Sequence, residues 1–171
     1  SGSEITLIPS ENYQITTMVD YETKVLGTQN ATLTKLSEFK DEFSNARTFS
    51  FLHEIEMLLE NNLIKGGDLN NAIVYVDKKI SENTMEKLKK AFNKDKVSVK
   101  SNGILDNLNL HYQNEAARHK LLDVLGDLAL IGKRIKGKVI AKKPGHFINT
   151  QFARKVSGII EKEERLNMKK Q

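Results

Sequence analysis

The sequence predicts an α+β fold in which helices form one layer of a two-layer sandwich and a small mixed sheet forms the other. Two stretches, 5–8 and 13–21, alternate apolar and polar residues as half-buried strands do. Longer segments carry apolar residues at helical spacing, most clearly over 114–131. Strands and helices are mixed without strict alternation, which favours the α+β class.

The first elements follow directly from these patterns. The strands at 5–8 and 13–21 flank Pro9-Ser10-Glu11-Asn12 and form either a hairpin or two consecutive strands. Apolar residues at helical spacing predict a helix over 34–45, and β-prone residues predict a short strand over 48–51.

The middle of the chain predicts two further helices, over 53–62 and 82–93. Each precedes a predicted strand, the first over 72–76 and the second over 96–99. Asn102-Gly103 predicts a turn, because this dipeptide favours left-handed backbone conformations.

The last third predicts a long helix over 114–131 and a strand over 136–142, which is broken by Pro144-Gly145. A final helix begins near His146 and continues into 161–171, whose charged residues are typical of a frayed end or a linker.

The composition limits the class of protein. A chain of 171 residues fits one domain or a tight pair of small ones, and 39% hydrophobic with 29% charged residues is ordinary for a globular protein. No apolar run approaches the roughly 20 residues of a membrane-spanning helix, and the sequence shows no charged-then-apolar segment that would lead us to expect secretion. The chain has no cysteine, which suits a reducing cytoplasm and leaves only His, Asp or Glu as metal ligands.

The charge balance favours an anionic partner. Lys and Arg number 27 against 22 Asp and Glu, a net charge of +5. Nucleic acid, a phosphorylated small molecule or acidic lipid would all fit, and so would a surface that merely aids solubility. Aromatic residues make up only 6% and do not interleave with basic runs, which counts against nucleic acid.

The long predicted helix carries the first candidate site. His119, Asp123 and Asp127 are spaced by four residues, so their side chains project from one face. A His and an Asp at this spacing can reach one metal ion. An exposed polar face or an ordinary helix ion pair is the alternative explanation, and the spacing alone does not decide between them.

Two further segments offer functional groups. His146 follows Lys142-Lys143-Pro144-Gly145, at the junction of a strand and a helix, where catalytic residues are often held. Thr48 lies between Arg47 and Phe49, and a hydroxyl among aromatic residues can line an apolar pocket. A plain turn and a core strand are the respective alternatives.

Together these segments resemble the UDP-3-O-acyl-N-acetylglucosamine deacetylase family, specifically its second domain. The resemblance covers roughly Glu4 to Lys155 and rests on four stretches, which occur in the family in this order: Ala46–Phe51, Gly66–Val74, Asn114–Asp127 and Lys143–Asn149. The family has two similar α+β domains that face each other across a zinc site.

The resemblance implies that His119 and Asp123 are two of three zinc ligands. The third ligand, a His, and the Glu general base belong to the first domain of the family. The remaining histidines His53 and His111 do not fall at the position of a ligand.

The same resemblance implies roles for further residues. His146 corresponds to the group that protonates the leaving amine or stabilises charge, Asp127 to its carboxylate partner, and Thr48 to a hydroxyl that stabilises the oxyanion. Lys120 and Lys143 correspond to positions near the anionic part of the substrate. Phe49 and Phe51 correspond to the insert that forms a passage for the acyl chain in the family. Ile55, Leu59 and Leu63 could line that passage, and packing in a core is the equally good alternative.

The resemblance also implies an organisation. Residues 1–160 form the second domain, with a βαβ insert at about 47–76, and 161–171 form a charged tail or a linker to a fused 3-hydroxyacyl-carrier-protein dehydratase domain. Ser1-Gly2-Ser3 lacks an initiator Met, as expected of a fragment or of a cloning remnant.

The expected function is that of a cytoplasmic zinc-dependent hydrolase, which removes the acetyl group of UDP-3-O-(3-hydroxyacyl)-N-acetylglucosamine in lipid A biosynthesis. The isolated fragment is expected to be inactive, because it lacks one ligand and the base. The alternative is a non-catalytic module of the same fold that binds a nucleotide sugar or a protein. Intact His119, Asp123, Asp127 and His146 count against that alternative.

Overall fold

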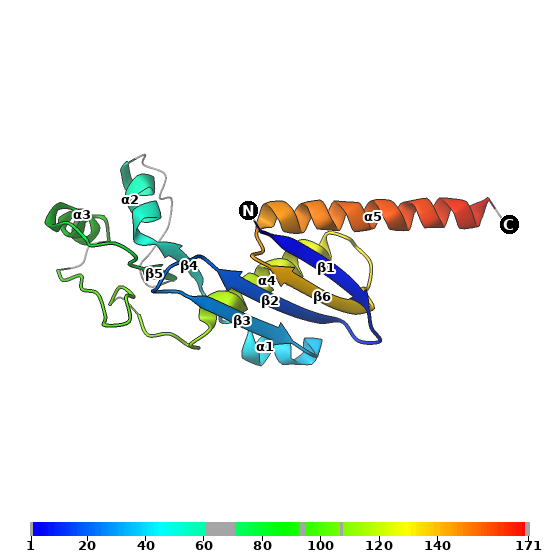
Figure 1. Ribbon diagram of the computed structural model, residues 1–171, viewed down its shortest axis with the longest axis horizontal. Helices are drawn as coiled ribbons and strands as arrows, with labels where there is room; N and C mark the ends of the chain where they lie inside the picture. Colours follow the sequence, from blue (N-terminus) through cyan, green and yellow to red (C-terminus); the bar gives the residue numbers. More distant parts are fainter. Residues whose placement is uncertain (1, 61–70, 93–94, 107, 170–171) are drawn as a thin grey trace. The chain divides into compact units, whose positions relative to one another are not determined.

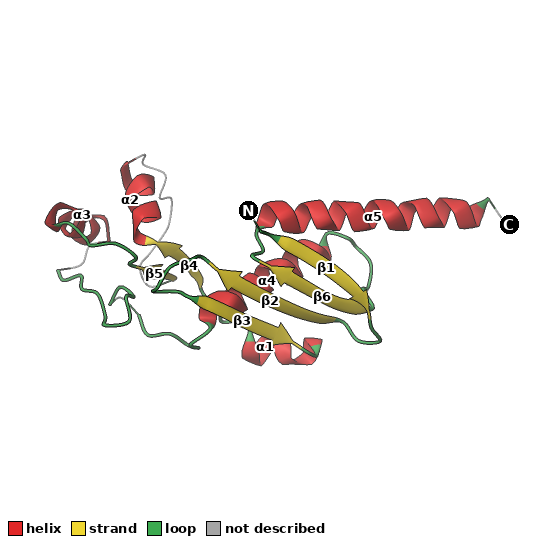
Figure 2. Cartoon of the chain, viewed as in Figure 1, coloured by secondary structure: helices red, strands yellow, loops and turns green. Residues whose placement is uncertain are grey.

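The computed structural model describes residues 2–60, 71–92, 95–106 and 108–169 and falls into two units. Unit 1 comprises Ser1–Val19, Gln29–Asn45 and Ala117–Gln171, and unit 2 comprises Asp20–Thr28 and Ala46–Ala116. Each unit combines strands with helices, so the predicted α+β class is confirmed (Figure 1, Figure 2).

The larger sheet has four strands in the order β1 (Glu4–Pro9), β6 (Gly137–Lys142), β2 (Gln14–Asp20) and β3 (Thr28–Leu33). Strand β6 pairs antiparallel with β1 and parallel with β2. Because β6 lies between β1 and β2, the first two strands are consecutive in the chain but do not form a hairpin. The predicted hairpin alternative is therefore wrong, and the alternative of two consecutive strands is confirmed.

Three elements differ from the sequence-based expectation. Strand β3 was not expected, because only Ala31 and Leu33 give its alternate positions an apolar character. The helix expected over 34–45 is a 3-10 turn, η1 (Leu36–Glu38), followed by the single turn α1 (Phe39–Glu42). Residues 96–99 form no strand, only a bridge between Val99 and Leu105.

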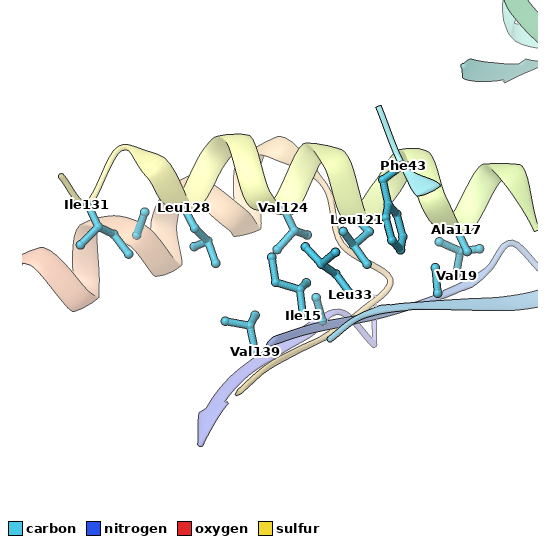
Figure 3. Close-up of a cluster of buried hydrophobic side chains, with 13 residues drawn as sticks. Ile15, Val19, Leu33, Phe43, Ala117, Leu121, Val124, Leu128, Ile131 and Val139 are labelled. Atoms are coloured by element: carbon cyan, nitrogen blue, oxygen red, sulfur yellow. The ribbon is translucent and has the colours of Figure 1, made fainter. Parts of the chain in front are cut away.

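Helix α4 (Glu115–Ala129) lies on one face of the four-stranded sheet (Figure 2). Its apolar residues recur at intervals of four, three and four, which gathers them on one side of the helix. Figure 3 shows them pointing toward strand residues Ile15, Leu33 and Val139. The helix side of this core is formed by Ala117, Leu121, Val124 and Leu128. Burial of each leucine stabilises the fold by about 1.5–3 kcal/mol, and it leaves the polar side of α4 available for chemistry.

Helix α5 (His146–Met168) begins directly after Gly145, whose extended backbone ends the connection from β6. Ala153, Val156 and Ile160 pack against the same core. The expected last helix is therefore confirmed, and it remains helical to Met168. No helix in the part of the chain that the structure describes is long and apolar enough to cross a membrane.

Unit 2 contains the expected βαβ arrangement. Strands β4 (Thr48–Phe51) and β5 (Ala72–Tyr75) pair in parallel, and α2 (Leu52–Glu60) connects with β4 directly. Helix α3 (Glu82–Phe92) buries Leu88 in a cluster with Val74 and Leu105. Residues 66–70 of the expected motif, and 61–62 of the expected helix, lie outside the described residues.

The expected turn at Asn102-Gly103 yields the first testable prediction. Gly103 has φ +76°, and an added Cβ would overlap Val25 Cγ1. Gly103→Ala should therefore lower the free energy of unfolding by about 2–4 kcal/mol, from backbone strain and overpacking together. Urea unfolding of the chain measures this change.

Gly27→Ala is the matched control for Gly103→Ala. Gly27 has a similar φ of +61°, but nothing lies within 4 Å of an added Cβ. This variant should show only the backbone effect, about 1 kcal/mol. Equal destabilisation of the two variants would contradict the importance of the contact with Val25.

Candidate metal and catalytic site

The polar side of α4 presents the three predicted residues at i, i+4 and i+8. The side chains of His119, Asp123 and Asp127 are 17%, 8% and 15% exposed, so all three are largely shielded from water. Their shared face follows from the helical period, since apolar residues occupy the side toward the sheet. The structure thus confirms the expected alignment of these residues along one helix.

His119 and Asp123 form the first pair. Their Nε2 and Oδ1 atoms are 3.5 Å apart, which is longer than an ordinary hydrogen bond. Two ligands of a tetrahedral zinc ion at about 2.0–2.2 Å from the metal would be roughly 3.4 Å apart. The separation therefore fits two donors to one ion. Within the described ranges, no group of three His, Cys, Asp or Glu side chains converges on one point.

Lys120 contacts this pair from the same helix. Its Nζ donates a hydrogen bond of 2.9 Å to Asp123 Oδ2, the oxygen that does not face His119. One carboxylate oxygen is thereby held by the lysine, and the other is directed toward His119. The role of Lys120 in substrate binding remains a prediction. The structure shows in addition that Lys120 contacts Asp123, the candidate metal ligand.

Asp127 and His146 form the second pair, between α4 and the first residue of α5. His146 Nδ1 lies 3.1 Å from Asp127 Oδ1 and 2.9 Å from Oδ2. Because a carboxylate can only accept, Nδ1 carries the hydrogen in this contact. The opposite ring nitrogen, Nε2, is then the atom available for proton transfer. The His146 side chain is 71% exposed, so it is accessible from solution in the described structure.

Asn149 is a third member of this group that was not predicted from the sequence. It lies one turn after His146 on α5, it is fully buried, and its Nδ2 donates a hydrogen bond of 2.8 Å to Asp127 Oδ2. Asparagine three residues after a candidate catalytic histidine was the available sequence signal. This spacing alone does not predict a contact with Asp127, because that contact depends on the packing of α4 beside α5.

Lys143 occupies an unusual backbone conformation just before His146. Its φ is +46°, in the left-handed region that few residues other than Gly, Asn and Asp adopt. Its backbone N–H donates a hydrogen bond of 2.7 Å to Met18 O, which continues the parallel pairing of β6 with β2. Strained backbone conformations cluster at functional sites, and the predicted role of Lys143 in substrate binding remains a prediction.

Replacement of Lys143 by glycine should therefore improve stability and weaken substrate binding. Lys143→Gly should raise the free energy of unfolding above that of Lys143→Ala by about 1 kcal/mol, because only glycine relieves the left-handed strain. Both variants lose the ammonium group and should raise KM for an anionic substrate equally. Urea unfolding of the chain and steady-state kinetics of the full protein measure the two effects separately.

Lys142→Ala provides the control for Lys143, since Lys142 is exposed and lies in the extended backbone of β6. A KM that rises as much in this control as in Lys143→Ala would show that general surface charge, and not Lys143, binds the substrate.

The remaining predicted residues lie in unit 2. Thr48 is exposed at the start of β4, and Phe49 and Phe51 follow on the opposite face of that strand. The two phenylalanines contact Tyr21 at ring-centroid distances of 5.5 and 5.6 Å. Ile55 is 7% exposed and packs in a different cluster, with Leu52 and Val74. The predicted acyl-chain role of these residues remains a prediction.

A buried ion pair anchors the start of the Thr48 strand. The carboxylate of Glu115 is fully buried and accepts hydrogen bonds from Arg47 Nε at 2.8 Å and from the Arg47 backbone at 3.1 Å. The His111 backbone donates a further bond of 2.7 Å. Burial acts to raise the pKa of Glu115, but the hydrogen bonds from Arg47 and His111 outweigh it, so the pKa lies below its ordinary value.

Comparison with known proteins identifies the family of this chain. The family described as LpxC, UDP-3-O-acyl N-acetylglycosamine deacetylase, matches residues 1–97 and 83–158. The chain is 47% identical over 91% of its length to a Bifunctional enzyme LpxC/FabZ of Bacteroides thetaiotaomicron, and 44% identical over 96% to one of Porphyromonas gingivalis. It is 33% identical over 89% to the UDP-3-O-acyl-N-acetylglucosamine deacetylase of Syntrophotalea carbinolica.

The chain therefore belongs to the UDP-3-O-acyl N-acetylglycosamine deacetylase family, as the resemblance implied. It spans 34% and 36% of the length of the two bifunctional relatives and 42% of the Syntrophotalea protein. The match thus covers a part of a longer architecture in each relative.

Proposed function

We propose that this chain is the second domain of a zinc-dependent deacetylase, which hydrolyses the acetamide of UDP-3-O-(3-hydroxyacyl)-N-acetylglucosamine in lipid A biosynthesis. The observation that carries the proposal is the row of functional groups on α4. A His–Asp pair at ligand spacing is followed, one turn later, by the carboxylate that holds His146. Family membership and the names of the relatives support the same activity.

His119 and Asp123 would hold the zinc ion through Nε2 and Oδ1. When bound, the ion supplies a Lewis acid that polarises the amide carbonyl and activates water. Lys120 keeps Asp123 Oδ2 occupied, so the carboxylate offers a single oxygen in the direction of His119. The third ligand and the general base are expected from the preceding domain of the full protein.

His146 acts on the leaving group in this proposal. Its Nδ1–H bonds to Asp127, which orients the ring and stabilises the imidazolium form electrostatically. Its Nε2 then gives a proton to the departing amine, which is a poor leaving group until it is protonated. Thr48 would donate its hydroxyl to the developing oxyanion.

The excess positive charge and the aromatic residues of the proposed site belong to different units, and each suits a different part of the substrate. The positive surplus of the sequence lies in unit 1, whereas unit 2 is close to neutral. Lys120 and Lys143 belong to unit 1 and suit the diphosphate of the substrate. The aromatic residues of β4 belong to unit 2 and suit its acyl chain.

Two features of the full protein belong to the same proposal. Bifunctional LpxC/FabZ relatives support a fused dehydratase domain, for which the charged end of α5 would serve as the linker. A chain without cysteine suits a cytoplasmic enzyme.

The test compares the isolated chain with the full protein that contains it. Only the full protein should deacetylate the nucleotide sugar, because one ligand and the base lie outside this chain. Removal of metal by a chelator should abolish that activity, and added zinc should restore it. Full turnover by the isolated chain would overturn the proposed division of the site.

A further inference from the structure

Asn149 is the one fully buried side-chain amide among the described residues, and it contacts the candidate catalytic pair directly. Its Nδ2 and the Nδ1 of His146 both bond to Asp127 Oδ2, at 2.8 and 2.9 Å. The carboxylate is thus held from two positions one turn apart on α5. We propose that Asn149 is a positioning residue, which fixes the Asp127 carboxylate so that it orients His146; this inference rests on the proposed function.

The amide has only one favourable orientation. Its Nδ2 must face the carboxylate, because Oδ1 in that place would bring two acceptors together. In this orientation Oδ1 is buried and has no hydrogen-bond partner among the described residues. An unpaired buried carbonyl destabilises the folded state, which offsets what the bond to Asp127 contributes. Folding alone therefore gives little reason for an asparagine here.

A function in positioning does give such a reason. Asp127 lies on α4 and His146 at the exposed first turn of α5, where an imidazole can adopt several rotamers. The helix interior around Asn149 is fixed by packing, and Ala153, one turn further, is buried in the core. Because packing fixes Asn149, its hydrogen bond fixes the Asp127 carboxylate. That carboxylate in turn fixes the His146 ring through Nδ1. Precise catalytic sites commonly require such hydrogen bonds, which hold the partner of a catalytic group in place.

Two variants remove the donor with different effects on packing. Asn149→Leu nearly preserves the volume, and Asn149→Ala leaves a cavity. Both should lower kcat of the full protein about tenfold, as part of the 10²–10⁴-fold that general acid catalysis contributes, with KM unchanged. Because the donor and not the packing matters, the two variants should agree in kcat although their stabilities differ. A loss of kcat that follows stability instead would overturn the inference.

A double substitution tests whether Asn149 acts through Asp127. In an Asp127→Ala background, Asn149→Leu should cause no further loss of kcat, since the group that it positions is gone. An additional tenfold loss in that background would show that Asn149 acts elsewhere. Thr150→Ala is the matched control on the same helix, because among the described residues the Thr150 hydroxyl bonds to the backbone oxygens of His146 and Phe147 and not to Asp127.

A spectroscopic measurement on the chain itself separates this inference from the proposed activity. The Nδ1–H proton of His146, assigned with His146→Ala, should give a protected NMR signal in the wild type and in Thr150→Ala. In Asn149→Leu and Asn149→Ala the signal should broaden or disappear. An unchanged signal in both would overturn the positioning role, even if His146→Ala abolishes activity. An active His146→Ala enzyme would instead overturn the assigned role of His146.

Discussion

His119→Ala should remove the metal from the full protein and lower kcat/KM by on the order of 10³-fold or more, because a zinc ion supplies several kcal/mol of transition-state stabilisation. The geometry supports this expectation through the 3.5 Å separation of His119 Nε2 and Asp123 Oδ1. After the substitution, Asp123 and the ligand expected from the preceding domain remain. Two ligands bind zinc much more weakly than three. Metal content and deacetylation rate measure the two effects.

His53→Ala is the matched control for His119→Ala. His53 bonds to Asp77 at 3.1 Å in unit 2 and takes no part in the proposed site. This variant should keep its metal and its activity. Normal metal content in His119→Ala would contradict the ligand assignment, whatever the activity. Loss of activity with metal retained would point to a role for His119 in substrate contact.

Glu115→Ala should lower the free energy of unfolding by about 3–5 kcal/mol, which is the usual effect of breaking a buried ion pair. The loss leaves the Arg47 guanidinium, 17% exposed, without its carboxylate. It also removes the acceptor for the backbone N–H groups of Arg47 and His111. Such a loss is a large share of the 5–15 kcal/mol that stabilises most domains. Urea unfolding of the chain measures it.

The same carboxylate predicts a pH dependence of stability. Hydrogen bonds lower the pKa of Glu115 in the folded state, so the folded carboxyl group binds its proton less readily than the unfolded one. Its contribution to stability should be complete above the unfolded pKa of about 4.3 and should decline as the pH falls through the lower folded value. Glu115→Gln should show a shallower loss of stability in this acid range than the wild type.

Glu86→Ala is the control for this ion pair, since Glu86 and Lys89 form an exposed pair on α3. Its removal should change stability little, because solvent screens exposed pairs. Replacement of both partners, as Arg47→Met with Glu115→Leu, should recover the part of the loss that comes from the unpaired Arg47 guanidinium. The part due to the backbone N–H groups of Arg47 and His111 should remain, because leucine offers them no acceptor. Equal destabilisation by Glu86→Ala and Glu115→Ala would contradict the importance of burial.

Several helices and strands were predictable because the spacing of apolar residues and the position of Pro and Gly correspond to the elements that the structure shows. The period of α4 and the stop at Pro144-Gly145 follow from short-range residue order, whereas the parallel pair around α2 was expected from the family resemblance. Strand β3 was missed because its sequence, TQNATL, has only two apolar residues to mark the buried face. Residues 96–99 were misassigned, since β-prone residues formed only a bridge there. In both segments, the neighbouring strands that are available for pairing decided whether a strand formed, and the β-propensity of the residues did not.

The sequence by itself determined that His119, Asp123 and Asp127 share one face of a helix, because four-residue spacing fixes this within any α-helix. It also placed Lys143 and His146 at a strand–helix junction. Only the tertiary structure decided that Asn149 and His146 hold Asp127, and that Glu115 holds Arg47. These contacts join residues that are 19 to 68 positions apart. Their formation depends on how elements pack, and no local pattern encodes the distance between two elements.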